Sequence, residues 1–436
     1  MIGVTGVQNA TSAPAERVIP LKHIARVNVA TLDDMTDPDY AFDYIDISSV
    51  TPEVGIARRE RVTFGTAPSR ARRKVAHGDT IVSTVRTYLR AVAFVDEPDD
   101  LVVSTGFAVL SPGAGVDPRY LYRAVQSKPF VDEVVARSTG VSYPAINPGE
   151  LGRIGVHLPD ADTQRAIADF LDRETERIDA LVAKKQRLIE LLQEKRTALI
   201  SRAVTKGLDP DVPLKDSGIE WLGAIPAHWE TRRLRVISPS QSVGLVINPS
   251  TYVVDEGVPF LFGSNISEFR IHADGARRIS PASNRFLAPS ILHSGDLVTV
   301  RVGDPGVTAV VPPELDGCNC ASVMITSRSP GFDSQWLCYV MNSRVGRAQV
   351  EMVQYGAAQK QFNISHAVDF RYPVPPLREQ IRIREHLDAQ LVRLSGLHRT
   401  AEAGRAVLHE YRSALITAAV TGQIEVGATT LTPAAK

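Results

Sequence analysis

The sequence predicts an α+β protein in which two strand-rich domains are separated by two long antiparallel coiled-coil helices. Three observations support this: a gap-free internal repeat, a heptad pattern that ends each copy, and strand-like segments before each copy. Residues 140–205 repeat at 356–421, so that Gln164 aligns with Gln380, 216 positions later. Two half-length copies predict two similar lobes related by an approximate two-fold axis.

Each globular region precedes one copy of the repeat, the first at residues 1–158 and the second at about 227–374. The turn Gly78-Asp79 corresponds to Gly295-Asp296, and each is followed by an apolar strand with a basic residue, Arg86 or Arg301. Short helices are predicted at residues 118–127 and 334–342. Apolar runs bounded by turn residues predict strands at 42–47, 80–85, 91–95, 107–110, 259–262, 297–302, 307–311 and 322–325.

A long amphipathic helix ends each copy, at residues 159–206 and 375–421. Apolar residues recur every seven positions, and both copies keep the same heptad phase although 216 is not a multiple of seven. This predicts that the two helices pack on each other through matching stripes. The predicted core residues are Ile167, Leu171, Ile178, Leu181, Leu188, Leu192 and Leu199 in the first helix and Ile383, Leu387, Leu394, Leu397, Leu408, Tyr411 and Leu415 in the second.

The length of the connection between the helices predicts that they are antiparallel. Residues 164–205 would form about 63 Å of helix. A parallel arrangement would require the linker, residues 207–226, to span nearly that distance fully stretched, at roughly 3.3–3.6 Å per residue. The linker contains Pro210, Pro213, Gly218 and Trp221, which indicate turns and a docked side chain instead. Each lobe is then expected at an opposite end of a two-helix rod, with residues 422–436 as a C-terminal tail.

Composition is typical of a globular protein, with 44% hydrophobic and 22% charged residues. The N-terminus has neither a basic start nor an apolar run, and no segment has the roughly 20 consecutive apolar residues that span a bilayer. Cys318, Cys320 and Cys338 are interpreted as small buried residues, because no matching His or Cys cluster follows them. We therefore expect a cytoplasmic protein with reduced thiols and no metal site.

Basic residues cluster locally although the formal net charge is zero. Between Arg58 and Lys74, seven positive residues stand against one acid, Glu60. Charge alone leaves open whether this is a solvated face or a nucleic-acid contact. Because two symmetric lobes suit duplex DNA, and because arginine and amide side chains pair with base edges, we predict DNA contacts. The candidates are Arg58, Arg59, Arg61, Arg70, Arg72, Arg73, Arg86, Tyr88, Tyr143, Arg270, Arg277, Arg278, Arg285, Arg301, Gln359 and Lys360.

Sequence motifs for catalysis are missing. We find no Asn-Pro-Pro-aromatic motif of an amino-methyltransferase, no phosphate-binding loop and no convincing nuclease cluster. Gly113-Ala114-Gly115 is followed by Val116-Asp117-Pro118, which is a poor entry to a cofactor-binding helix. The chain is therefore expected to be non-catalytic, with no cofactor of its own.

Three stretches carry a recognisable pattern. Leu158-Pro159 is followed by QRAIADFLD at 164–172, RIDALVAKK at 177–185 and LIELLQEKR at 188–196. Residues 215–229 read KDSGIEWLGAIPAHW, and residues 375–380 read PPLREQ. These stretches closely resemble, in turn, the central conserved region, the lead-in to the second target recognition domain and the distal conserved region of type I restriction-modification specificity subunits. The first lobe departs from this pattern because it begins with the shorter segment 17–22, which leaves the docking of residues 1–20 open.

The resemblance implies two target recognition domains that read a bipartite DNA sequence with a fixed gap. It also implies two modification (methyltransferase) subunits as partners, which bring S-adenosylmethionine, with restriction subunits that use ATP and Mg as an optional addition. The helix pair would fix the distance between the two reading domains. Two alternatives stay open: a coiled-coil scaffold protein whose lobes bind proteins rather than DNA, and a standalone enzyme.

Overall fold

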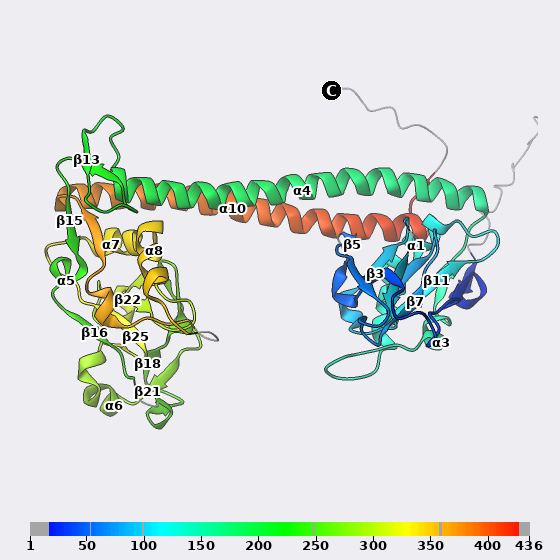
Figure 1. Cartoon of the computed structure of the whole chain (residues 1–436), viewed down its shortest axis with the longest axis horizontal. Coiled ribbons are helices and arrows are strands. Elements are labelled where there is room, and N and C mark those ends of the chain that lie inside the picture. Colours follow the sequence, from blue (N-terminus) through cyan, green and yellow to red (C-terminus); the bar gives the residue numbers. More distant parts are fainter. Residues whose placement is uncertain (1–16, 53, 98–99, 247–248, 357–359, 427–436) are drawn as a thin grey trace, which may run out of the picture. The chain divides into compact units, whose positions relative to one another are not determined.

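The computed structural model describes residues 17–52, 54–97, 100–246, 249–356 and 360–426. The chain forms two compact units, residues 1–186 with 402–436 and residues 187–401. Each unit contains one globular lobe and parts of two long helices, α4 (Ala161–Lys206) and α10 (Leu377–Val420) (Figure 1). Within the described ranges, no helix is long and apolar enough to cross a membrane.

The first lobe contains two four-stranded sheets, with strand orders β6-β3-β10-β7 and β2-β11-β8-β9. A third, two-stranded pair joins β1 to β12. The strands are β1 (Val18–Pro20), β2 (Ala25–Val27), β3 (Ala41–Ile45), β4 (Val50–Thr51), β5 (Gly55–Ile56), β6 (Glu60–Thr63), β7 (Ala71–Lys74), β8 (Thr80–Ser83), β9 (Val92–Phe94), β10 (Leu101–Ser104), β11 (Phe107–Pro112) and β12 (Gly155–His157). The helices are α1 (Pro118–Gln126), α2 (Lys128–Ala136) and α3 (Pro148–Leu151).

The second lobe contains two corresponding sheets, with strand orders β17-β21-β18-β24 and β16-β25-β22-β23. Its strands are β15 (Glu230–Arg233), β16 (Gln241–Val243), β17 (Val253–Val254), β18 (Val258–Leu261), β19 (Ile266–Ser267), β20 (Arg270–Ile271), β21 (Arg277–Ile279), β22 (Leu297–Val300), β23 (Thr308–Val310), β24 (Asn319–Cys320), β25 (Val323–Thr326) and β26 (Arg371–Val374). Its helices are α5 (Leu234–Ile237), α6 (Pro281–Phe286), α7 (Ser334–Asn342), α8 (Arg344–Val353) and α9 (Ile364–Ala367). The lead-in forms a hairpin of β13 (Leu214–Asp216) and β14 (Ala224–Pro226).

The internal repeat extends further back than the gap-free stretch of residues 140–205, as the predicted short helices at 118–127 and 334–342 indicate. The first residues of α1, α2 and α3 are related to those of α7, α8 and α9 by the same offset that relates Gln164 to Gln380. Strands β11 and β25 begin at positions related in the same way. Each lobe also has one parallel strand pair, β3 with β10 and β18 with β24. The lobes differ in one connection. In the first lobe strand β7 lies between β6 and β8, whereas in the second lobe helix α6 lies between β21 and β22. The predicted α+β class, strands and duplicated fold are confirmed.

A buried glutamine fixes each lobe to a long helix in the same way. Gln164 at the start of α4 accepts a hydrogen bond of 2.9 Å from the backbone N–H of Asp117, the residue that caps α1. Gln380 accepts a 2.9 Å hydrogen bond from the backbone N–H of Asp333, the residue that caps α7. Both glutamines are 1% exposed. Because a buried amide must find partners for its own polar atoms, this side chain defines how each lobe meets its helix.

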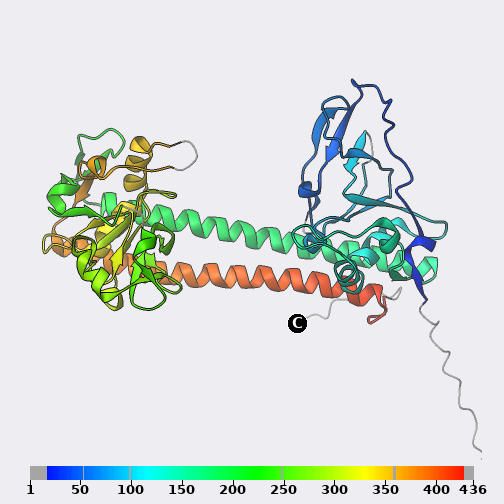
Figure 2. The ribbon, with the colours of Figure 1, turned by 90° about the horizontal axis from the view of Figure 1, so that it is seen from below.

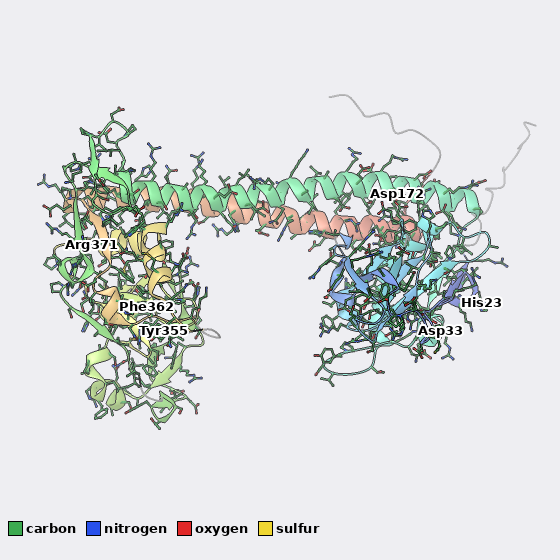
Figure 3. The ribbon with its side chains drawn as sticks, in the orientation of Figure 1. His23, Asp33, Asp172, Tyr355, Phe362 and Arg371 are labelled. Atoms are coloured by element: carbon green, nitrogen blue, oxygen red, sulfur yellow. The ribbon has the colours of Figure 1, made fainter. Side chains whose placement is uncertain are left out.

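An aspartate further along each long helix binds the lobe through different side chains. Asp172 accepts a 2.8 Å hydrogen bond from Arg123 of α1 and lies on α4 beside the first lobe (Figure 3). Its counterpart Asp388 accepts a hydrogen bond from the hydroxyl of Tyr339 on α7. Arg123 and Tyr339 are themselves equivalent positions of the repeat. Both halves thus keep the aspartate on the long helix, but the side chain that donates to it is an arginine in the first half and a tyrosine in the second.

The two long helices are antiparallel within each unit. In the first unit, the start of α4 (Ile167 and Leu171) and the end of α10 (Ile416) share one core with the lobe. In the second unit, the end of α4 (Val204) and the start of α10 (Ile383) share another core. Figures 1 and 2 both show the two helices side by side. The predicted antiparallel pair is confirmed.

One of the two predicted heptad stripes is wrong by one residue. Ile178 and Leu192 are buried as predicted, but the predicted Leu181 and Leu188 are 48% and 42% exposed. The second buried stripe of α4 instead contains Thr175 and Ile189, which are 2% and 3% exposed. In α10 the predicted core residues Leu397 and Tyr411 are likewise exposed. The remaining predicted core residues are buried or half-buried: Ile167, Leu171, Leu199, Ile383, Leu387, Leu394, Leu408 and Leu415.

Candidate nucleic-acid interface

Two loops pair at one edge of the first lobe. The β8–β9 turn (residues 84–91) meets the loop of residues 139–145 through a β-bridge between Val85 and Ala145. The backbone N–H of Arg86 also donates a 2.8 Å hydrogen bond to the carbonyl oxygen of Pro144. Arg86 has a φ of 52°, which non-glycine residues rarely adopt. We call residues 84–91 and 139–145 the first tip.

The first tip brings together three of the predicted DNA contacts. The Arg86 guanidinium lies over the ring of Tyr143, 4.8 Å from its centroid. Tyr143 is 60% exposed and Tyr88 is 53% exposed. Within the described ranges, no carboxylate pairs with Arg86. An exposed cation with two exposed aromatic rings can contact phosphates, base edges and base faces.

The second lobe has a corresponding pair of loops, residues 302–306 and 355–361, which we call the second tip. A β-bridge joins Val302 to Gln361, and the N–H of Gly303 donates a 3.0 Å hydrogen bond to the carbonyl oxygen of Lys360. Gly303 therefore occupies the place of Arg86, and its φ of 100° lies in the same left-handed range. Gln359, a predicted contact, lies outside the described residues, and Lys360 is exposed.

The predicted correspondence between Arg86 and Arg301 is wrong by two residues. Arg301 is half-buried, and its Nε donates a 3.3 Å hydrogen bond to the carbonyl oxygen of Phe362. Tyr355 and Phe362 mark the two ends of the loop beside it (Figure 3). The sequence match relied on a Gly-Asp turn followed by any basic residue, whereas the backbone pairing between the two loops fixes the true register.

Sheet topology divides the basic run of the first lobe between two places. Strands β6 and β7 are the opposite edges of one four-stranded sheet. Strands β3 and β10 therefore separate Arg61 and its neighbour Arg59 from Arg72 and Arg73. Arg61 pairs with Asp43 at 3.2 Å and Asp100 at 3.6 Å, and Arg59 pairs with Glu97 at 3.5 Å. These partly exposed ion pairs leave less net positive charge for a ligand at this strand.

The β7 arginines are half-buried in the lobe. Arg72 lies over the ring of Phe64, 4.5 Å from its centroid, and donates to the carbonyl oxygen of Ala71 at 3.0 Å. Burial lowers the pKa of the half-buried Arg73 guanidinium. Arg58 and Arg70 are exposed, as is Lys74 at the end of the run.

In the second lobe the predicted arginines are exposed and lie on neighbouring elements. Arg270 is on β20 and Arg285 is on α6. Arg277 and Arg278 are on β21, where Arg277 lies 5.2 Å from the Phe262 ring centroid and Arg278 donates to a backbone carbonyl. Sequence reasoning missed Arg347 of α8, which pairs with Asp304 of the second tip at 2.6 Å. No local signal connects these two residues, because they are 43 positions apart.

The helices expose apolar side chains at equivalent places in the two units. In the first unit the exposed large apolar residues of the two helices are Leu181, Val407 and Tyr411, and we call them the first patch. In the second unit the helices expose Leu188, Leu191, Leu377, Val392 and Leu397, and we call Leu188, Leu191 and Leu397 the second patch. The repeat spacing relates Leu181 to Leu397 and Leu191 to Val407. Two of the three residues of each patch are thus related by the repeat, whereas Tyr411 corresponds to Lys195 and Leu188 to Gly404.

The described residues contain no group of three or more His, Cys, Asp or Glu side chains able to hold a metal ion. Cys318, Cys320 and Cys338 are buried and free. Burial raises the pKa of the Cys318 thiol to about 12 and raises the pKa of the other two thiols further. These thiols are therefore protonated and unreactive in the folded protein.

Comparison with known proteins gives a consistent set of relatives. The chain is 27% identical over 130 residues to the type I restriction enzyme HindI specificity subunit of Haemophilus influenzae, covering 29% of this chain and 28% of that protein. It is 23% identical over 287 residues to the MjaVIII specificity subunit of Methanocaldococcus jannaschii, covering 62% of this chain and 63% of that protein. It is 26% identical to the putative MjaX specificity subunit of the same organism, covering 73% of each. The chain is a homologue of type I restriction specificity subunits. No protein-family model matches it.

Solved structures of type I specificity subunits share the fold. A chain of the type I R-M system, described in connection with complex assembly and conformational transition, has a TM-score of 0.74 at 21% identity and covers 95% of this chain and 100% of that chain. The HsdS subunit of Thermoanaerobacter tengcongensis has a TM-score of 0.51 at 22% identity and covers 94% of this chain and 98% of that chain. The duplicated lobes and long helices are therefore a fold shared with these subunits.

Proposed function

We propose that the chain is the DNA-recognition subunit of a type I restriction-modification complex. In this proposal each lobe reads one half of a bipartite duplex site, and the paired helices fix the spacing between the halves. The observation that carries it is the contrast between the two tips. The same backbone pairing joins Arg86 to Pro144 in the first lobe and Gly303 to Lys360 in the second, and only the first lobe has an arginine there, which lies over the ring of Tyr143. Two tips with the same backbone pairing but different exposed side chains are suited to binding two different DNA sequences.

The exposed residues provide the chemistry of base and phosphate recognition. Arg86, Tyr88 and Tyr143 are the proposed contacts of the first tip, and Lys360 is that of the second. Arg270, Arg277, Arg278 and Arg285 are proposed to contact DNA from the second lobe, with Arg58 and Arg70 from the first. Arg59 and Arg61 are proposed to act mainly within the first lobe because carboxylates pair with them. Arg72, Arg73 and Arg301 are proposed to do so because they are half-buried, unlike the exposed candidates.

The two patches support the binding of two copies of one partner. Because the repeat relates the patches, a partner that fits the first fits the second in the same manner. We propose that these partners are the modification subunits, which supply S-adenosylmethionine and the methylating site. Restriction subunits, where present, would supply ATP- and Mg-dependent chemistry, and the chain itself would catalyse neither reaction. The proposed place of action is the cytoplasm, where the host DNA lies.

Methylome sequencing of the host tests this function directly. Deleting the chain should abolish methylation at one bipartite motif, and the wild-type chain supplied in trans should restore it. A chain in which the first lobe, residues 17–158, is exchanged for that of a relative should restore methylation at a motif altered in one half only. Unchanged methylation after deletion, or changes in both halves after the exchange, would contradict the proposal.

A further inference from the structure

A cavity of about 170 Å³ lies in the first unit, between the first lobe and α10. Its wall includes Arg90, Lys128, His409, Arg412 and Ser413. None of the described residues that line it is an aspartate or a glutamate. The volume is many times the roughly 15 Å³ that one water molecule requires. A solvated space lined by three permanent cations and a histidine favours an anion.

The carboxylates that pair with these cations lie outside the cavity wall. Asp179 holds Arg412 from α4, and Arg412 is only 13% exposed. Asp132 pairs with Lys128 and lies 3.8 Å from Arg90. Three permanent cations therefore face two carboxylates, which leaves a positive excess at the cavity. Arg412 is held in place, while the Lys128 side chain stays 63% exposed and can turn toward a ligand.

The second unit shows that the corresponding place accepts an anion. The counterpart of Arg412 is Arg196, which pairs with the carboxylate of Glu268 at 3.0 Å. The Arg196 guanidinium also lies over the ring of Phe269, 5.1 Å from its centroid. Glu268 and Phe269 form the turn between β19 and β20. The lobe thus supplies the carboxylate that pairs with Arg196 in the second unit, whereas in the first unit Asp179 of α4 pairs with Arg412 and the lobe side of Arg412 borders the cavity.

The corresponding hairpin of the first lobe does not repeat this arrangement. Strands β4 and β5 occupy the place of β19 and β20, and Pro52 of their turn lines the cavity. Thr51 pairs with Gly55 and Ser267 pairs with Arg270, so the first turn has three residues, 52–54, where the second has two, Glu268 and Phe269. The described residues of the first turn, Pro52 and Val54, are neutral, whereas the second turn places a carboxylate on Arg196.

We propose that this cavity binds a phosphate group of the DNA backbone, as a sequence-independent contact of the first unit. This rests on the proposed DNA-recognition function. Guanidinium, ammonium and hydroxyl donors converge from α2, α10 and the β8–β9 turn, and Lys128 begins α2, where the helix dipole adds positive potential. Arg90 belongs to the first tip, so a phosphate in the cavity would be bound beside the residues proposed to read bases. Such contacts position a reader without specifying sequence.

The test is the salt dependence of duplex binding, measured with the full chain alone and together with its modification subunits. Lys128→Gln should weaken binding to the recognised duplex and to a scrambled duplex equally, by roughly eightfold at 0.1 M salt. The slope of log affinity against log salt should fall by about 0.9, and Lys128→Glu should lower affinity further. Arg344→Gln, the equivalent position in the second unit, is the matched control and should leave the slope unchanged. Chemical acylation of Lys128 should be slowed by duplex DNA.

The outcomes separate this inference from the proposed function. If the wild-type chain does not bind duplex DNA, the proposed function fails. If it binds but both Lys128 variants keep the wild-type slope, only the cavity proposal fails. Inorganic phosphate is the second probe: protection of Lys128 by phosphate but not by DNA would assign the cavity to a free anion. Glu53 follows Pro52 and lies outside the described residues, so the variant Glu53→Gln is tested as well. If duplex DNA protects Lys128 from acylation only in that variant, the proposal is overturned.

Discussion

The guanidinium of Arg412 donates a hydrogen bond of 2.9 Å from Nε to Oδ1 of Asp179, joining α10 to α4 in the first unit. The second unit has no equivalent of this pair. Arg196 occupies the place of Arg412, but Ser395 stands where the counterpart of Asp179 would be. Arg196 pairs with Glu268 of its own lobe instead. The two halves of the helix pair are thus fastened by different interactions.

Replacing Asp179 by Asn should therefore destabilise the first unit selectively. Arg412 is largely buried, so losing its charged partner should cost about 1–2 kcal/mol. All three tryptophans, Trp221, Trp229 and Trp336, are in the second unit. The midpoint of urea unfolding should therefore fall when unfolding is followed by circular dichroism, but it should stay unchanged when unfolding is followed by tryptophan fluorescence. Glu174→Gln, which removes a partner of the exposed Arg177, is the control and should change stability by less than about 0.5 kcal/mol.

The buried glutamines give a second, paired prediction. Gln380→Leu leaves the backbone N–H of Asp333 without its acceptor in a buried site, which should cost about 1–3 kcal/mol in the second unit. The buried thiols, all in that unit, should then react faster with iodoacetamide at pH 8. Gln164→Leu makes the same change in the first unit and should leave thiol labelling at the wild-type rate. Equal acceleration by both variants would show that the two units unfold together.

The internal repeat made most of the fold predictable, because one alignment locates the helices, the caps and the strands of both lobes. The error in the predicted heptad stripe shows that the repeat does not determine which face of each helix is buried. Leu181 follows Ile178 by three positions and Val182 follows it by four, and either spacing continues an apolar stripe. Burial of Ile189 and exposure of Leu188 settle the choice. A residue that binds a partner has the same apolar signature as one that packs in the core.

The candidate site was less predictable because it depends on contacts between distant residues. The run from Arg58 to Lys74 is continuous in sequence, but its strands β6 and β7 lie at opposite edges of a sheet. The carboxylates of Asp43 and Asp100 that engage Arg61 come from elsewhere in the chain. Conversely, Arg86 and Tyr143 are 57 positions apart and meet only because the tip loops pair.

At the first tip, Arg86→Asn should relax recognition of one half-site. Asparagine tolerates the left-handed backbone of this position, so the change removes the charge with little strain. Loss of a bidentate base contact should cost about 1–3 kcal/mol of discrimination, and methylome sequencing should show degeneracy in one half of the motif only. Arg61→Gln is the control, since Arg61 is engaged by carboxylates. Equal weakening of all sequences by Arg86→Asn would instead assign Arg86 to phosphate contact.

The patches predict how many modification subunits assemble on each variant. Leu181→Glu and Leu397→Glu change equivalent positions in different patches. Each should lower the stoichiometry from two modification subunits to one, because a charge in an apolar contact is costly to desolvate. The double variant should bind neither. Native mass spectrometry gives these numbers directly. Lys184→Glu, an exposed and already polar position on α4, is the control and should keep two.

The helix pair predicts the length of the gap between half-sites. Gln186 of α4 contacts Arg405 of α10, so residues 184–190 and 401–407 lie opposite each other and can be deleted together without changing the heptad register. Seven residues of helix correspond to about 10.5 Å, which is close to three base pairs of B-form DNA at roughly 34 Å per turn. The deleted segments contain Leu188 and Val407 of the two patches, so the gap is measured on the chain itself, by selecting bound duplexes from a pool in which the spacing is varied. The doubly deleted chain should bind the same two half-sites with a gap about three base pairs shorter. Binding at the original gap would show that the spacing is set elsewhere, and loss of binding should be reversed by restoring both segments but not one.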